Sequence, residues 1–137
     1  METSPTPAVD MSPEAYDDFV SELYWAVYEE WALYEVTHGA IERLSTGDVR
    51  HGPWLATDCA EILMRWFRAE LLGLYRYTPR RDNGPDLTAT EAVDALSATD
   101  RWVMSEDWTQ VVALFLTGKG QSTPFSDWKQ IAARPQS

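Results

Sequence analysis

The sequence predicts a single α+β domain that is mainly helical, on the strength of three observations. The chain has 137 residues and 45% hydrophobic content, which fits one globular domain rather than a disordered segment. Apolar residues recur at helical spacing over residues 12–31 and 54–72. Two shorter segments, Leu74–Thr78 and Trp108–Thr117, are rich in large apolar residues and are predicted to be strands. We therefore expect long helices, one small antiparallel sheet and a short C-terminal helix.

The first helix follows a lead, residues 1–11, whose prolines and small polar residues predict disorder. Ser12 is suited to cap the helix and Pro13 to occupy its first position. The helix is expected to reach about residue 31, and the domain that it opens is expected to span residues 12–120. Its predicted buried stripe consists of Tyr16, Phe19, Val20, Leu23, Val27 and Trp31.

The next segments are predicted from short patterns. Residues 31–36 fit either a continuation of the first helix or a short extended piece, and residues 37–44 are expected to form a second, short helix. The sequence Ser-Thr-Gly-Asp at residues 45–48 should end that helix. A long helix is then expected over residues 54–72, with Gly73 ending it. Its predicted buried residues are Leu55, Cys59, Ile62, Leu63, Trp66 and Phe67.

The two predicted strands should pair with each other. Leu74–Thr78 is expected to lie antiparallel to Trp108–Thr117, because each strand alone would leave its backbone groups without partners. Between them, residues 79–85 have the composition of a loop, and Thr88 with Glu91 matches a capping box that opens a short helix to about residue 96.

The C-terminal part, residues 121–137, is predicted to be a tail with one short helix. Gly118 and Gly120 should stop the preceding strand. Thr123-Pro124 then opens a helix, whose apolar face would carry Phe125, Trp128 and Ile131 or Ala132.

This order of elements resembles the winged helix-turn-helix fold. The carriers are the helix-to-strand junction Glu-Leu-Leu-Gly-Leu-Tyr-Arg at residues 70–76 and the returning strand Val-Ala-Leu-Phe-Leu-Thr-Gly-Lys-Gly at residues 112–120. The resemblance covers about residues 13–120 and implies a three-helix core with a small sheet. Its wing would run over residues 79–107 and contain a helix, unlike an ordinary wing loop.

In that fold the helix over residues 54–72 takes the DNA-recognition position. The resemblance then implies that five arginines lie near a DNA backbone: Arg65, Arg68, Arg76, Arg80 and Arg81. Two features oppose this role. Glu61 stands four residues before Arg65, at a spacing that favours a pair on a helix. The chain as a whole is acidic, so nucleic acid ranks below a protein as the expected partner.

The charge is distributed unevenly. The chain has 22 acidic and 11 basic residues, a net charge of −11. Residues 1–42 contain carboxylates but no Lys or Arg. Such a field repels phosphate backbones and favours basic partners. The simpler alternative is that the carboxylates only keep a tryptophan-rich surface soluble.

One face of the first helix combines aromatic and acidic residues. Opposite the buried stripe, helical spacing brings together Asp18, Glu22, Trp25, Tyr28 and Glu29. A cluster of aromatics among carboxylates marks a contact surface, so this face is predicted to bind a basic protein or a second copy of the chain. The alternative is that Trp25 packs under the N-terminal lead or the C-terminal helix.

The sequence offers no catalytic or metal-binding constellation. Glu35 and His38 have the spacing of metal ligands on a helix, but His51 is the only other histidine and three or four ligands are needed. Cys59 is the single cysteine and falls on an apolar stripe, so an inert core thiol is expected. No glycine-rich phosphate loop or nucleophile elbow is found. We therefore expect no enzymatic activity, no metal and no cofactor.

These observations predict a non-enzymatic, acidic protein-interaction module, of the kind found among inhibitor, immunity or antitoxin proteins that mask a basic surface. The alternative is a winged-helix transcriptional regulator. No segment approaches the ~20 apolar residues that span a bilayer, and the N-terminus lacks the pattern of a secretory signal. A cytoplasmic protein without membrane contact is expected.

Overall fold

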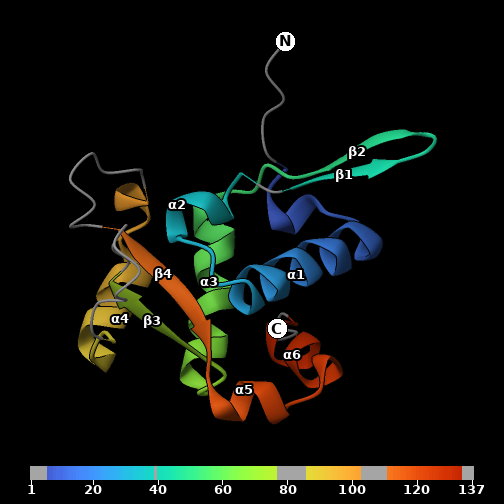
Figure 1. Cartoon of the computed structure of the whole chain (residues 1–137). Coiled ribbons are helices and arrows are strands. Elements are labelled where there is room, and N and C mark those ends of the chain that lie inside the picture. Colours follow the sequence, from blue (N-terminus) through green and yellow to red (C-terminus); the bar gives the residue numbers. More distant parts are fainter. Residues whose placement is uncertain (1–5, 39, 77–85, 103–110, 134–137) are drawn as a thin grey trace.

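The computed structural model describes residues 6–38, 40–76, 86–102 and 111–133, and shows an α+β fold that is mainly helical (Figure 1). The helices are η1 (Ala8–Asp10), α1 (Pro13–Tyr28), α2 (Leu33–Val36), α3 (Ala56–Arg68), α4 (Ala89–Ser97), η2 (Thr99–Arg101), α5 (Gly118–Ser122) and α6 (Phe125–Ala132). The strands are β1 (Ala40–Leu44), β2 (Gly47–His51), β3 (Leu72–Arg76) and β4 (Val112–Leu116). Within the described residues, every helix is too short or too polar to cross a bilayer.

Helix α1 forms where the sequence predicts it. Ser12 caps it by accepting a hydrogen bond from the Ala15 amide at 3.1 Å, and Pro13 stands at its first position. Four of the predicted stripe residues are buried, and Tyr16 and Trp31 are partly buried against the same core. Ahead of α1, residues 8–10 form η1, and Ala8 is buried with its amide donating to Asp58 Oδ2 at 2.8 Å.

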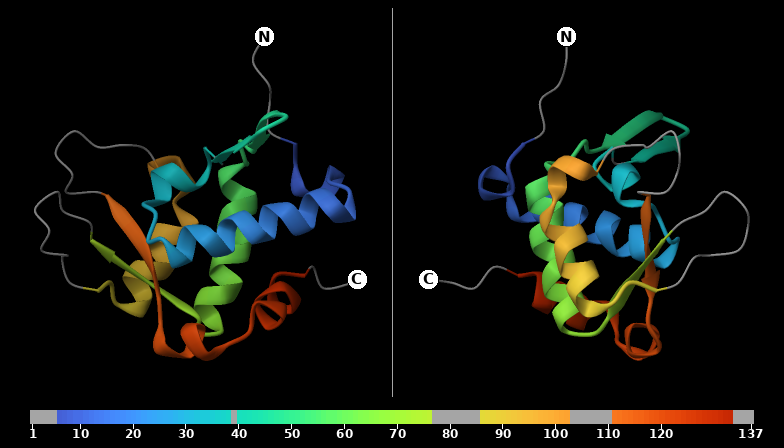
Figure 2. Two further views of the ribbon diagram at one scale, coloured as in Figure 1. Left: turned by 45° about the vertical axis from the view of Figure 1, so that its right-hand side comes forward. Right: turned by 90° about the vertical axis from the view of Figure 1, so that its left-hand side faces the viewer.

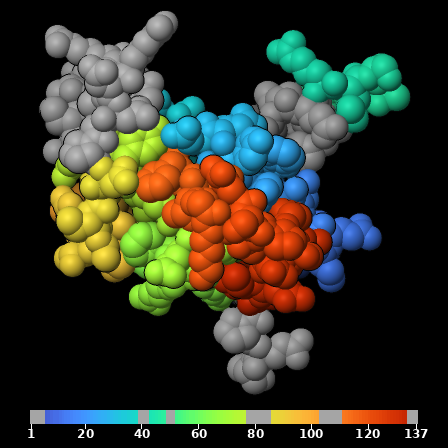
Figure 3. Space-filling view, turned by 60° about the horizontal axis from the view of Figure 1, so that its bottom comes forward, coloured from blue at the N-terminus to red at the C-terminus, as the bar shows by residue number. Residues whose placement is uncertain are grey.

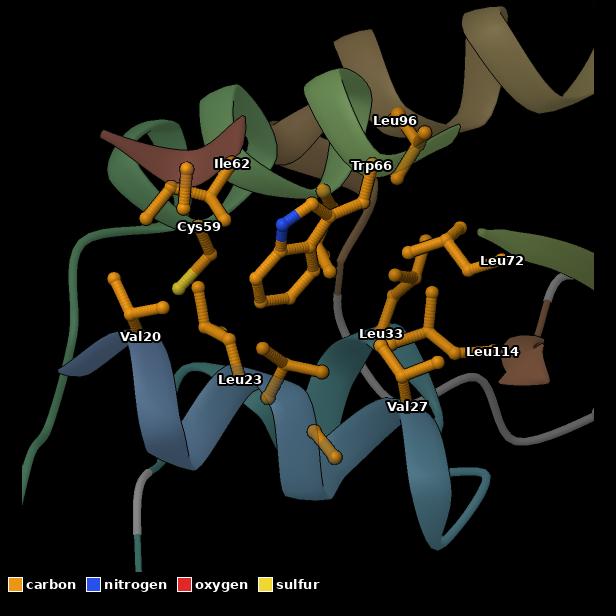
Figure 4. Close-up of a cluster of buried hydrophobic side chains, with 14 of the residues drawn as sticks. Val20, Leu23, Val27, Leu33, Cys59, Ile62, Trp66, Leu72, Leu96 and Leu114 are labelled. Carbon is orange, nitrogen blue, oxygen red and sulfur yellow. The ribbon is translucent and has the colours of Figure 1, made fainter. Parts of the chain in front are cut away.

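Helix α3 crosses α1 and forms the other side of the core (Figure 2). Cys59, Ile62, Leu63 and Trp66 are buried as predicted, and Trp66 lies at the centre of the cluster between the two helices (Figure 4). Leu55 and Phe67, also predicted in the stripe, are only partly buried.

Both long helices end with a glutamate in the left-handed conformation. Glu30 follows α1 with φ 58° and Glu70 follows α3 with φ 66°. At each end the amide of the glutamate and the amide of the residue after it donate hydrogen bonds to carbonyls of the last helical turn, as in a Schellman motif. Helix α3 therefore ends at Arg68, and the expectations that it reaches residue 72 and that Gly73 ends it are wrong.

The β3–β4 sheet confirms the predicted antiparallel pairing in its described part. Leu74 is opposite Leu114, and Gly73 is opposite Phe115. The outer ends of the two predicted strands, residues 77–78 and 108–110, lie outside the described residues. A Cβ on Gly73 would overlap the ring of Phe115, so the glycine makes room for that ring. Ala32 bridges the other side of β4 through Ala113.

The predicted short helix over residues 37–44 is wrong. Residues 40–51 form the antiparallel hairpin β1–β2, which turns at residues 45 and 46 and projects from the body of the molecule (Figure 1). Helix α2 lies earlier, at residues 33–36. A segment of so few residues carries too little periodicity to separate a helix from a strand, whereas the turn residues that follow favour a hairpin.

The capping box at α4 is confirmed, since Thr88 and Glu91 each accept the other's amide hydrogen.

The C-terminal helices α5 and α6 lie below the core in the view of Figure 1. The glycines that were expected only to stop the strand lie within α5. Helix α6 forms as predicted and buries Trp128 and Ala132.

Candidate interaction surface

The predicted contact face of α1 is partly exposed. Trp25 is 47% exposed and Tyr28 is 57% exposed, so neither packs under the described lead or under α6. Glu29 is exposed, and its Oε2 accepts a hydrogen bond from Trp31 Nε1 at 3.5 Å. Asp18 and Glu22 are half-buried and take part in interactions within the chain. The structure therefore presents the C-terminal half of the predicted face more openly than its N-terminal half.

The exposed aromatics belong to a ladder of ring contacts that begins in the core. Trp66, which is fully buried, stacks edge-on against Trp128 with ring centroids 4.9 Å apart. Trp128 contacts Tyr24 at 5.0 Å, Tyr24 contacts Trp25 at 5.7 Å, and Trp25 contacts Tyr28 at 5.5 Å. These five rings are called the aromatic ladder below. It fixes the orientation of the exposed rings because edge-to-face contacts hold them against a rigid interior.

A groove of about 840 Å³ lies beside the outer end of this ladder. Aromatic residues from α1, β3 and β4 line it, together with two acidic residues: Tyr24, Tyr28, Tyr75, Phe115, Glu30 and Asp86. We call it the aromatic groove. The end of α1 supplies one wall and the outer face of the β3–β4 sheet supplies the other, and Figure 3 shows the end of α1 in blue next to β4 in orange.

The sheet presents aromatic residues on its outer face for a simple reason of register. Phe115 lies opposite Gly73, and Tyr75 lies opposite Ala113, so each large ring is paired with a small residue. The rings of Tyr75 and Phe115 are 6.1 Å apart between centroids. Leu74 and Leu114 point the other way and are fully buried. The alternation of a strand therefore divides the sheet into a core face and an aromatic outer face.

The aromatic groove is acidic. Glu30 and Asp86 are exposed, and no lysine or arginine is among the described residues that line the groove. Glu30 forms no ion pair with any other described residue, whereas Glu70, at the equivalent helix end, lies 3.7 Å from Lys119 Nζ. A cation that entered the groove would meet ring faces and carboxylates together.

The structure describes three of the five arginines predicted from the winged-helix resemblance. Arg65 pairs with Glu61 and donates a hydrogen bond to the Ala132 carbonyl at 2.9 Å, so it holds α6 against α3. Arg76 lies 3.5 Å from Glu91 of α4. Arg68 is exposed at the end of α3, and Arg80 and Arg81 lie outside the described residues. Arg65 and Arg76 are thus engaged in contacts within the chain.

A second, smaller pocket of about 210 Å³ lies between α2, α4 and the sheet. Its floor is apolar and includes Leu33 and Trp102, and its rim carries the Arg76–Glu91 pair. Each charge at the rim faces an opposite charge, and Trp102 Nε1 donates to the Ala95 carbonyl at 2.9 Å. The charged side chains among the described residues that line this pocket are therefore engaged with one another.

Other residue types with possible chemistry serve structural roles. Burial raises the pKa of the Cys59 thiol far above its usual range, with the nearby Asp58 carboxylate adding to the shift, so the thiol is a poor nucleophile. Glu35 Oε1 accepts the Ala32 amide at 3.1 Å and thereby caps α2. Among the described residues, no group of three His, Cys, Asp or Glu side chains could hold a metal ion.

Sequence reasoning missed most of the aromatic groove. The helical period indicated Tyr28, but Tyr24, Glu30, Tyr75, Asp86 and Phe115 were not singled out. The alternation of β4 placed Phe115 opposite the buried Leu114 face, which was a usable signal. Nothing in the sequence says that this outer face lies beside the end of α1, since that depends on how the helices pack.

Comparisons of this chain with known protein families, curated proteins and solved structures give no match.

Proposed function

We propose that this chain is a non-enzymatic interaction module that binds a basic protein through the outer face of α1. The observation that carries the proposal is the exposure of Trp25 and Tyr28, at 47% and 57%, within an acidic surface. Exposed rings held in place by the aromatic ladder are available for binding without reorganisation. Aromatic residues of this kind are enriched at interface hot spots.

The charge favours a basic partner over a second copy of the chain. The net charge is −11, and two copies that met through their acidic faces would bring like charges together. A basic partner would instead be steered by the field, which predicts fast association that weakens as salt is added. An inhibitor or immunity-type protein, which masks a basic surface, would use these properties.

The winged-helix alternative has one observation in its favour. A short extended piece over residues 31–36 was one of the two alternatives for that segment, and Ala32 forms an isolated bridge to Ala113 of β4 there. Against DNA binding stand the net charge and the use of Arg65 to hold α6. The DNA-binding function is therefore kept as the second candidate.

The test uses an arginine-rich peptide with glycine spacers, titrated into the full chain by calorimetry at low and at physiological ionic strength. We expect binding that weakens with salt and that Trp25→Ala reduces. Leu44→Ala is the matched control, because Leu44 is 46% exposed but lies on the projecting hairpin. Equal losses from the two variants, or no binding at low salt, would remove the proposal.

A second titration, with mixed-sequence duplex DNA, separates the two candidate functions. We expect no saturable binding at physiological salt, because the negative field opposes the phosphates. Saturable DNA binding that Arg68→Ala weakens would favour the winged-helix regulator. Light scattering that shows a dimer which Trp25→Ala dissociates would favour a second copy as the partner.

A further inference from the structure

The aromatic groove combines ring faces with two carboxylates that pair with no described cation, at the edge of the proposed binding surface. We infer that it is a receptor site for an arginine side chain of the basic partner, an inference that rests on the proposed function. Tyr28 of α1 and Phe115 of β4 both line the groove, together with the acidic residues Glu30 and Asp86. A guanidinium group can stack on a ring face and pair with a carboxylate at the same time.

The chain already holds a cation in the same way next to the groove. Lys129 Nζ lies 5.8 Å from the centroid of the Phe125 ring and pairs with Asp17. Phe125 is in turn 4.7 Å from Tyr24, one of the groove residues. The 5.8 Å between Lys129 Nζ and the Phe125 ring is within the range at which a cation is attracted to a ring. The chain therefore already places one cation between a carboxylate and an aromatic ring, and that ring packs against Tyr24.

The backbone at Glu30 gives a second reason. Glu30 and Glu70 both occupy the left-handed position after a helix, where glycine is preferred and a residue with a side chain is strained. At Glu70 the carboxylate faces Lys119 within the chain. Glu30, in contrast, is among the residues that line the aromatic groove. A strained residue that lines a site fits a role in binding rather than in stability.

Arginine fits the groove better than lysine does. The guanidinium group is planar, stacks on aromatic faces and is more weakly hydrated than an ammonium group, so it loses less solvation in a half-enclosed site. The half-buried ring of Phe115 offers a flat surface against which a planar group can lie, and the buried ring of Tyr75 packs beside it at 6.1 Å between centroids. An anionic ligand is disfavoured by Glu30 and Asp86.

The experiment compares two variants that should both stabilise the fold. Glu30→Gly and Glu70→Gly each relieve a left-handed glutamate, so both should raise the midpoint of thermal unfolding by a few degrees. With the same arginine-rich peptide as above, Glu30→Gly should weaken binding by about two- to fivefold, the effect of one exposed ion pair. Glu70→Gly should leave binding unchanged. If Glu30→Gly gains stability but loses binding, while Glu70→Gly gains stability and binds normally, then Glu30 belongs to the binding site.

A second pair of measurements tests the ring chemistry. Tyr28→Leu keeps an apolar side chain at an exposed position but removes the ring, and should weaken binding by about two- to fivefold. A peptide with citrulline in place of each arginine keeps the shape but not the charge, and should not bind measurably. A lysine peptide of equal charge should bind more weakly than the arginine peptide.

The outcomes separate this inference from the proposed function. If the peptide binds and depends on Trp25 but not on Glu30 or Tyr28, the arginine site is wrong and the interaction surface stands. Equal binding of the arginine and lysine peptides would also overturn the arginine site. If no basic peptide binds at any salt concentration, both proposals fall.

Discussion

Trp66 and Tyr28 lie at the two ends of the aromatic ladder, and they differ in burial and in how much they contribute to stability. Trp66 is fully buried, donates its indole hydrogen to the Trp128 carbonyl at 2.8 Å and fills the space between α1 and α3. Tyr28 is 57% exposed, and its ring contact is with Trp25, which is itself 47% exposed. The inner end of the ladder therefore stabilises the fold, whereas the outer end adds aromatic surface from which the fold gains little. This difference favours the outer end of the ladder as the part that binds a partner.

The largest expected effect is at the inner end. Trp66→Ala removes a large buried ring and leaves the Trp128 carbonyl without its donor, so unfolding free energy should fall by ~3–5 kcal/mol. Urea denaturation followed by circular dichroism measures the change. A loss below ~1 kcal/mol would show that the two ends of the ladder do not differ in the way described.

A smaller effect is expected where α5 packs against the start of the sheet. A Cβ on Gly120 would overlap the backbone carbonyl of Leu71, which cannot move aside as a side chain could. Gly120→Ala should therefore cost ~1–3 kcal/mol through overpacking. Gly118→Ala is the matched control, because a Cβ there meets nothing within 4 Å. Equal unfolding midpoints for the two variants would contradict this account of the inner packing.

Next in size is the contact that joins α3 to α6. Arg65 donates to the Ala132 carbonyl from a side chain that is 23% exposed, and the Tyr16 hydroxyl donates to the same oxygen at 2.8 Å. Arg65→Gln should cost ~1 kcal/mol, since one of two donors to that carbonyl is lost in a partly solvated place. Arg68→Gln, at an exposed position, should cost less. If Arg65→Gln left stability unchanged, its assignment to the fold rather than to a nucleic-acid contact would lose its basis.

A smaller, pH-dependent contribution comes from Glu91. The Thr88 amide and hydroxyl donate to its carboxylate and, with Arg76 nearby, hold the pKa of Glu91 below its usual value. A lowered pKa in the folded state means that the stabilisation is present above the ordinary glutamate pKa and is lost as the pH falls through the lowered one. The difference in unfolding midpoint between the wild type and Glu91→Gln should therefore shrink on acidification. A difference that stayed constant from neutral to acid pH would contradict the capping interaction.

Features that depend on residues close together in the sequence could be predicted, whereas features that depend on tertiary packing could not. Ser12 and Thr88 were identifiable as caps because capping is set by residues three positions apart. The pairing of β3 with β4 followed from the need of each strand for a partner. The end of α3 was misplaced because glycine is the usual left-handed residue, whereas here Glu70 takes that position and Gly73 makes room for Phe115.

The candidate surface was likewise predictable only where it depends on the local helical pattern. The exposure of Trp25 and Tyr28 follows from the helical period, since they lie opposite the stripe that contains Leu23 and Val27. The aromatic groove was not predictable, because it requires Phe115 and Glu30, far apart in the sequence, to line the same groove. Only the packing of α1 against the sheet brings them together.

The central claim is that the outer end of the ladder serves binding and not folding, and Trp25→Ala tests it most directly. The unfolding free energy and the affinity for the arginine-rich peptide are measured on the same preparation, beside Leu44→Ala. The account predicts that Trp25→Ala changes stability by less than ~1 kcal/mol, because the ring is 47% exposed, and that it weakens peptide binding clearly. A variant that loses several kcal/mol of stability, or that binds the peptide as well as the wild type does, would contradict it.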